Sequence, residues 1–152
     1  MNLAARELFV LEAELDTPQL VDKTPYGTRK VVAVLGGTFV GERLRGRIMP
    51  TGGHDWALTR SDGVLELDVR LTLETDDGAR ILMTYRGFRH GAPEVMTRMS
   101  SGEYIDPSEY YFRTIPFFET GSEKYSWLNS IVCVGYGDRV KAGPKYTIYE
   151  VL

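Results

Sequence analysis

The clearest hydrophobic pattern in the chain runs from Val64 to Glu74, where apolar and polar side chains alternate strictly. Leucine or valine stands at every odd position from 65 to 73, with charged residues or threonine between them. Because successive side chains of a strand point to opposite faces, this pattern predicts a strand with one buried face and one polar face. Asp77-Gly78, which is typical of tight hairpin turns, follows the strand, and residues 79–88 return as its partner.

Short apolar runs recur along the rest of the chain, separated by glycines and turn dipeptides. Runs of this kind, rich in β-branched and aromatic residues, are typical of antiparallel strands. The further expected strands are Glu7–Leu15, Lys30–Leu35, Thr38–Phe39, Arg45–Met49, Asp55–Thr59, Tyr110–Ile115, Ser130–Tyr136 and Tyr146–Leu152. Gly36-Gly37 lies inside a strand-rich stretch and predicts a bulge or a close approach of two backbones.

Two segments depart from the strand pattern. Arg89–Ser108 contains two prolines and no alternation, which predicts a long loop or an excursion that contains a short helix. Ser122–Asn129 predicts a helical turn with Ser122 as its N-cap, placed where it would close one end of a barrel.

These elements predict a single all-β domain over residues 1–152 with about eight to ten strands. A closed or nearly closed antiparallel barrel is expected, because closure leaves no exposed strand edge, and a two-sheet sandwich is the alternative. Barrels of this strand number can enclose a lipocalin-like cavity for one small ligand.

Composition narrows the classes of partner. The net charge is −3 and no basic cluster occurs, which argues against nucleic acid and an anionic membrane surface as partners. No apolar run has the length of a membrane span, and no basic segment of a signal peptide opens the sequence, so a cytoplasmic location is expected. The single cysteine, Cys133, lies in an apolar run and is interpreted as a small buried side chain. Apolar edge strands would suit a homodimer.

The sequence contains no nucleophile elbow, phosphate loop or dinucleotide fingerprint, and with two histidines no metal site is expected. Its most unusual cluster is Gly52-Gly53-His54-Asp55-Trp56. Asp55 is the candidate acid or base, because a carboxyl group inside a barrel has a raised pKa. His54 and Trp56 are candidate substrate contacts. In the alternative interpretation, Asp55 accepts backbone N–H groups of a loop and Trp56 packs in the core.

Other polar candidates lie on strands. Arg113 stands among aromatic residues and could hold a carboxylate or phenolate, or it could lie on the outer face beside a surface carboxylate. Tyr85 follows apolar residues at period two and is predicted to face the interior. Asp68 and Arg70 are further candidate substrate contacts, although their place on a polar strand face favours a solvated outer surface.

The order of the motifs resembles the domain-of-unknown-function family 3237. The resemblance covers Tyr26–Arg29, Gly36–Gly41, Leu44–Pro50, Gly52–Trp56, Asp62-Gly63, Asp76–Gly78, Tyr111–Gly121 and Tyr125–Asn129. It implies a β-barrel from a family whose members occur in bacteria and fungi, some linked to cofactor-independent ring-opening, decarboxylation or ring-closing of aromatic compounds. Asp55 and Trp56 match the family pattern Gly-Gly-x-Asp-Trp. The later family motif is matched at Tyr111, Arg113, Trp127 and Asn129.

The residues and the resemblance together support an enzyme that needs no cofactor and converts a small aromatic or phenolic molecule by acid–base chemistry, as a lyase or a cyclase. Asp55, Tyr85 and Arg113 are its expected catalytic residues. Its expected substrate contacts are His54, Trp56, Asp68, Arg70, Tyr111, Trp127 and Asn129. The alternative functions are a lipocalin-like protein that binds a ligand without converting it, and a barrel filled by its own side chains.

Overall fold

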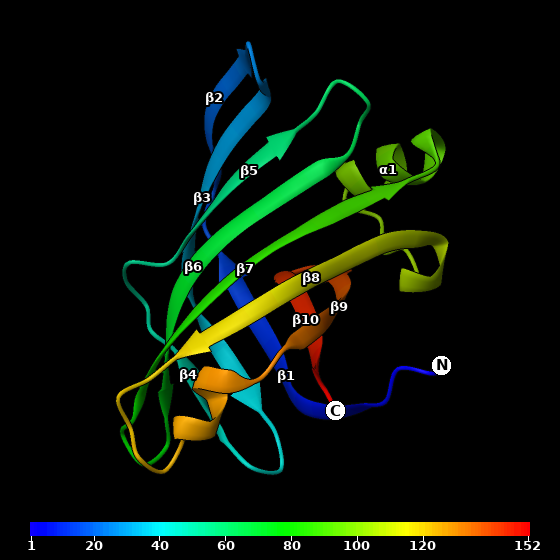
Figure 1. Ribbon diagram of the computed structural model, residues 1–152. Coiled ribbons are helices and arrows are strands. Elements are labelled where there is room, and N and C mark those ends of the chain that lie inside the picture. The colour runs from blue at the N-terminus through cyan, green and yellow to red at the C-terminus, as the bar shows by residue number, and fades with distance from the viewer.

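The computed structural model describes residues 1–152, and most of the chain is one antiparallel sheet that closes on itself (Figure 1). The strands are β1 (Ala5–Leu15), β2 (Gln19–Thr24), β3 (Gly27–Val40), β4 (Arg45–Ile48), β5 (His54–Thr59), β6 (Leu65–Thr75), β7 (Arg80–Gly91), β8 (Tyr110–Glu119), β9 (Cys133–Val140) and β10 (Gly143–Val151). One α-helix, α1 (Pro93–Ser100), and two 3₁₀ turns, η1 (Pro107–Glu109) and η2 (Ser126–Ser130), complete the fold. No helix is long and apolar enough to cross a membrane.

The sheet order confirms the predicted barrel. The strands follow the order β1-β10-β9-β8-β7-β6, after which β4 and β5 both bridge β6 to β3, and β3 pairs with β1 to complete the ring. Because β4 and β5 pair with different parts of β3 and β6, they share one place in the ring, which makes an eight-stranded barrel. Strand β2 pairs only with β3. A two-sheet sandwich is excluded by this closed pairing.

Strand β3 joins the segments expected as Lys30–Leu35 and Thr38–Phe39 and changes partners at Gly36-Gly37. Before the glycines it pairs with β2 and β5, its pairing with β1 begins at Val34, and its pairing with β4 begins at Gly37. Gly37 has a φ of 138°, and a Cβ there would lie 2.0 Å from the carbonyl oxygen of Glu12. The predicted close approach of two backbones is confirmed.

The packed core runs from the end of the barrel that holds β4 and η2 towards the end where Figure 1 shows β5 and α1, because one buried cluster includes Leu128 of η2 and Val95 of α1. The odd-numbered residues of β6 are buried, as the alternation predicts. Phe9 lies between Phe39 and Phe118, with ring centroids 5.3 and 5.8 Å apart respectively. Each of these rings is almost fully buried, so the aromatic cluster removes apolar area from water and stabilises the fold.

The two irregular segments differ in detail from expectation. Within Arg89–Ser108, strand β7 continues to Gly91, and α1 begins at Pro93, a residue suited to the first helical turn. Near the other end of the barrel, η2 follows Tyr125, and Ser122 does not cap it. The Tyr125 hydroxyl instead donates to Asp77 at 3.0 Å, which fixes the turn against the β6–β7 hairpin.

A nearly buried ion pair ties the last strand to the first. The side chain of Glu150 in β10 is 11% exposed and accepts hydrogen bonds from Arg6 and Arg43. Glu150→Gln is expected to lower the free energy of unfolding by about 2 kcal/mol, because both arginines lose a charged acceptor. Urea denaturation measures the change. The control Glu12→Gln removes an exposed carboxylate that lies 3.7 Å from Lys145, and it should change the free energy of unfolding by less than about 0.5 kcal/mol. Equal effects of the two substitutions would show that the Glu150 ion pair does not stabilise the fold more than a surface pair does.

Candidate functional site

A pocket of about 410 Å³ opens at the barrel end that carries β5 and α1. Its apolar wall comes from inward-facing residues of β3, β5, β6 and β8, including Val32, Ala57, Leu67 and Phe112. Met99 and Ser100 of α1 contribute to its rim. Polar and charged side chains come from β3, β5, β7, β9 and β10, so the pocket combines an apolar wall with a few polar groups, as small-molecule sites do.

Asp55 projects into the pocket from β5. Strands β5 and β6 keep one register on both sides of this point, but the Asp68 N–H donates to Asp55 Oδ1 at 3.1 Å instead of joining the ladder, and the Trp56 carbonyl accepts from Arg29. Burial raises the pKa of the Asp55 carboxyl group to about 6, and the Asp68 N–H and the charge of Lys30 limit the rise. Asp55 can therefore both donate and accept a proton near neutral pH.

Two tyrosines and Phe112 form an aromatic wall inside the pocket. The rings of Tyr85 and Phe112 each lie 5.3 Å from the ring of Tyr146, edge to face. Burial raises the pKa of both tyrosines, so both hydroxyl groups remain protonated and available as hydrogen-bond donors. The hydroxyl groups of Tyr85 and Tyr146 lie close enough to interact, although the buried Tyr146 hydroxyl makes no hydrogen bond of good geometry.

Four cationic side chains also line the pocket: Lys30, Arg89, Arg139 and Lys141. None of them forms an ion pair with a carboxylate. Arg89 projects inward from β7, with its guanidinium 5.7 Å from the centroid of the Phe112 ring, and its buried Nε has no hydrogen-bond partner. Burial, followed by the charge of Arg89, lowers the pKa of Lys30.

Of the residues expected at the site, the structure brings Asp55 and Tyr85 to the pocket. His54 and Trp56 alternate with Asp55 and face outward, where their rings lie 5.6 Å apart and Trp56 is 38% exposed. The core packing weighed for Trp56 is therefore not observed either. Asp68 and Arg70 lie on the outer face of β6, which is the solvated position that the alternation favours.

Arg113 lies outside the barrel, which corrects the interior position considered for it. Its guanidinium lies 3.8 Å from the ring centroid of Tyr136 and 5.2 Å from that of Tyr111, and it donates to the Phe112 carbonyl. Tyr111 is exposed and stacks on His90. The outward side chains of β8 are mostly apolar, so alternation in the sequence could not assign its faces.

Trp127 and Asn129 lie near the opposite end of the barrel from the pocket. Arg43 covers the Trp127 ring at 4.3 Å. Asn129 accepts the Thr120 N–H at 2.8 Å and donates to the Thr120 carbonyl at 3.0 Å, so its amide closes the loop after β8. Neither side chain lines the pocket.

The charged and tyrosine residues of the pocket that sequence reasoning missed are Asp16, Lys30, Arg89, Arg139, Lys141 and Tyr146. Arg89 lies four positions after Tyr85 and shares its strand face, so the expected strand end at Phe88 stopped one residue too early to include it. Cys133 is buried as interpreted, and burial raises the pKa of its thiol to about 11. No group of three or more His, Cys, Asp or Glu side chains is arranged to hold a metal ion.

Comparisons with known proteins place this barrel among relatives. The family model described as "Protein of unknown function (DUF3237)" matches residues 4–151. The UPF0311 protein of Clostridium acetobutylicum is 34% identical over 146 residues, which cover 95% of this chain and 92% of that protein. A crystal structure of a conserved protein of unknown function from Rhodopseudomonas palustris matches with a TM-score of 0.95 and 32% identity, over 100% of this chain and 99% of that one. A hydroalkoxylation enzyme of Penicillium herquei is 25% identical over 116 residues, 76% of this chain and 62% of the enzyme.

Proposed function

The chain belongs to the DUF3237 family, and we propose that this member is an acid–base enzyme that closes or opens an oxygen heterocycle in a small molecule held in the barrel pocket. The observation that carries the proposal is Asp55, a carboxyl group with a pKa of about 6 that faces a pocket also lined by two protonated tyrosines. The name of the Penicillium herquei relative, a hydroalkoxylation enzyme, supports the same reaction class.

Hydroalkoxylation adds an O–H group across a carbon–carbon double bond and forms an ether. In the proposed reaction, protonated Asp55 gives its proton to one alkene carbon while the substrate oxygen bonds to the other. The hydroxyl proton of the substrate then passes to the Asp55 carboxylate, so the acid is restored and no atom is gained or lost. The reverse sequence opens the ring, with the proton delivered to the ether oxygen.

The pocket walls suit this chemistry. Protonating an alkene leaves a carbon with cationic character, and the apolar side chains of the pocket wall offer that carbon no competing nucleophile. Tyr85 and Tyr146 line the same pocket, where a hydroxyl donor can orient the substrate oxygen. We assign Tyr85 and Tyr146 this orienting role.

Turnover of a simple alkenylphenol tests the function. We expect the wild-type protein to convert ortho-prenylphenol into the dimethylchroman isomer, detected by chromatography at unchanged mass. Because only protonated Asp55 donates, kcat should fall as the pH rises through about 6. Recovery of the phenol unchanged, although calorimetry shows that it binds, would instead support the alternative of a ligand-binding protein without catalysis.

A further inference from the structure

We propose that Arg89, supported by Arg139 and Lys30, binds a carboxylate group of the ligand, so that the pocket takes a small aromatic carboxylic acid in its ionised form. As a statement about the substrate this rests on the proposed function, but the binding step can be measured without any reaction. Neither the family description nor the relatives' names specify an anion site.

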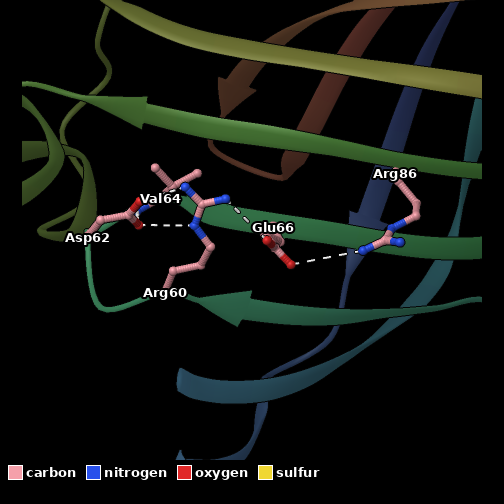
Figure 2. Close-up of polar contacts among 5 residues, drawn as sticks. All are labelled: Arg60, Asp62, Val64, Glu66 and Arg86. Carbon is pink, nitrogen blue, oxygen red and sulfur yellow. Dashed lines mark hydrogen bonds and ion pairs between the residues drawn. The ribbon is translucent and has the colours of Figure 1, made fainter. Parts of the chain in front are cut away.

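Arg89 lacks the hydrogen-bond partners that a buried guanidinium group normally has, and an anion could supply them. Its side chain projects inward from β7, and its Nε is buried without a hydrogen-bond partner. Several arginines on the outside of this barrel are paired with carboxylates. Figure 2 shows Arg60 between Asp62 and Glu66, with the Arg60 Nη2 to Asp62 Oδ2 distance at 2.6 Å and the Arg60 Nη1 to Glu66 Oε1 distance at 3.3 Å. A buried guanidinium without such partners is costly unless a ligand supplies them.

The charge of the pocket points to the same ligand. Four cationic side chains line it against two carboxylates, Asp16 and Asp55, and neither carboxylate is ion-paired with a cation. Burial and then the charge of Arg139 lower the pKa of Arg89, and burial and the charges of Arg89 and Arg139 lower the pKa of Lys30, so these cations lie close enough to repel one another. An anion bound between them would relieve this repulsion, because it attracts both groups.

The shape and chemistry of the walls select the class of anion. A planar carboxylate matches the fork of a guanidinium, and the Tyr146 hydroxyl, which lies beside that of Tyr85 without a well-formed hydrogen bond, can turn to donate one to the ligand. Phe112 and Tyr146 offer ring edges and faces against which an aromatic ring packs well. A phosphate dianion fits less well, since the second negative charge would lie near the Asp55 carboxylate.

A carboxylate at Arg89 would also act on the proposed acid. The charge of Arg89 favours the ionised form of Asp55 in the free protein. A bound carboxylate offsets that charge and therefore favours the protonated form, which is the form that donates a proton. The anion site would thus prepare Asp55 for catalysis when the substrate arrives.

Isothermal titration calorimetry with non-reacting probes tests the anion site. Benzoate and benzamide have nearly the same shape, and only benzoate carries a charge. We expect the wild-type protein to bind benzoate at least about tenfold more tightly than benzamide, a preference that charge-assisted hydrogen bonds can supply. Arg89→Met keeps the apolar stem and should abolish the preference. Arg86→Met is the matched control, since Arg86 lies on the same strand but faces outward, and it should leave the preference unchanged.

Further measurements keep the test decisive. Thermal denaturation of Arg89→Met shows whether it folds, and Arg139→Gln, which should weaken benzoate binding severalfold, provides an independent variant. The proposal would be overturned by any of three results with the wild-type protein: equal affinity for benzoate and benzamide, tighter binding of phenyl phosphate than of benzoate, or no binding of benzoate. The benzoate concentration should reach about 10 mM, so that millimolar affinities can be detected. Any of those results would refute the anion site but not the proposed reaction, because ortho-prenylphenol is neutral. Conversely, if the wild-type protein bound benzoate but did not convert ortho-prenylphenol, the proposed reaction would be refuted and the anion site would stand.

Discussion

Replacing Asp55 by asparagine is expected to lower kcat for ortho-prenylphenol by about 10²–10⁴-fold, the contribution that a positioned general acid commonly makes. Asparagine retains the oxygen that accepts the Asp68 N–H, so the local pairing of β5 with β6 should persist. Its amide has no proton to give at neutral pH. Because the substitution removes proton transfer and little binding, KM should change much less than kcat.

The matched control is Asp68→Asn, which alters an exposed carboxyl group on the outer face of the neighbouring strand. Its kcat should equal that of the wild-type protein within about twofold, since surface changes of this kind are close to neutral. If Asp55→Asn retained full activity, Asp55 would not be the acid. If both variants lost activity equally, the loss would lie in the strand pair and not in the carboxyl group.

The stability of Asp55→Asn provides a second readout on the same variant. The folded protein holds the Asp55 pKa at about 6, above the ordinary value of 3.8 for an aspartic acid, so folding favours the protonated form and burial of the charge costs free energy above pH 6. The variant should therefore be more stable than the wild-type protein at pH 8, by roughly 1–3 kcal/mol, and the difference should vanish below about pH 4. Urea denaturation at the two pH values measures it.

Among substitutions of glycine by alanine in this barrel, Gly37→Ala is expected to lower the free energy of unfolding the most. The φ of 138° disfavours every residue except glycine, which costs about 1–3 kcal/mol, and overpacking adds a similar amount, for a total of about 2–5 kcal/mol. The new Cβ would lie 2.0 Å from the Glu12 carbonyl oxygen, so β1 and β3 would have to move apart where they close the ring.

Gly121→Ala is the control for that substitution, because a Cβ at Gly121 meets nothing within 4 Å. Chemical denaturation should show a change below about 0.5 kcal/mol for Gly121→Ala, as for other unconstrained surface positions. A Gly37→Ala barrel as stable as the wild type would show that the two strands can separate without loss, and the role given to the glycine in closure would have to be abandoned.

Alternation predicted the barrel because most of its strands bury one face. Alternation did not identify a strand or a strand end where no apolar face is buried or where a charged residue faces inward. All but one residue of β2 are exposed, so no hydrophobic signal marks the strand. The charged side chain of Arg89 lies on the inward face of β7. It interrupts the alternation of apolar and polar residues, so the pattern did not show that β7 continues past Phe88. Positions that break such rules are often functional, because a binding site needs polar groups where folding alone would place apolar ones.

The same reasoning explains which site residues the sequence could reveal. Asp55 stood out because it follows two glycines, and Tyr85 because it continues an apolar face. Arg139 and Tyr146 come from the last two strands, and only closure of the ring brings them beside Asp55. No spacing along the chain records that neighbourhood.

The joining of the first strand to the last has a consequence for how the protein is made. Ala5 pairs with Val151, and β1 can complete its two-sided pairing only when β10 is present. During synthesis the first strand therefore has one sheet neighbour, β3, until the last strand leaves the ribosome. Contacts that span nearly the whole chain also slow the search for the native state, so refolding belongs to the millisecond-to-second class of β-rich proteins and not to the microsecond class of helical bundles.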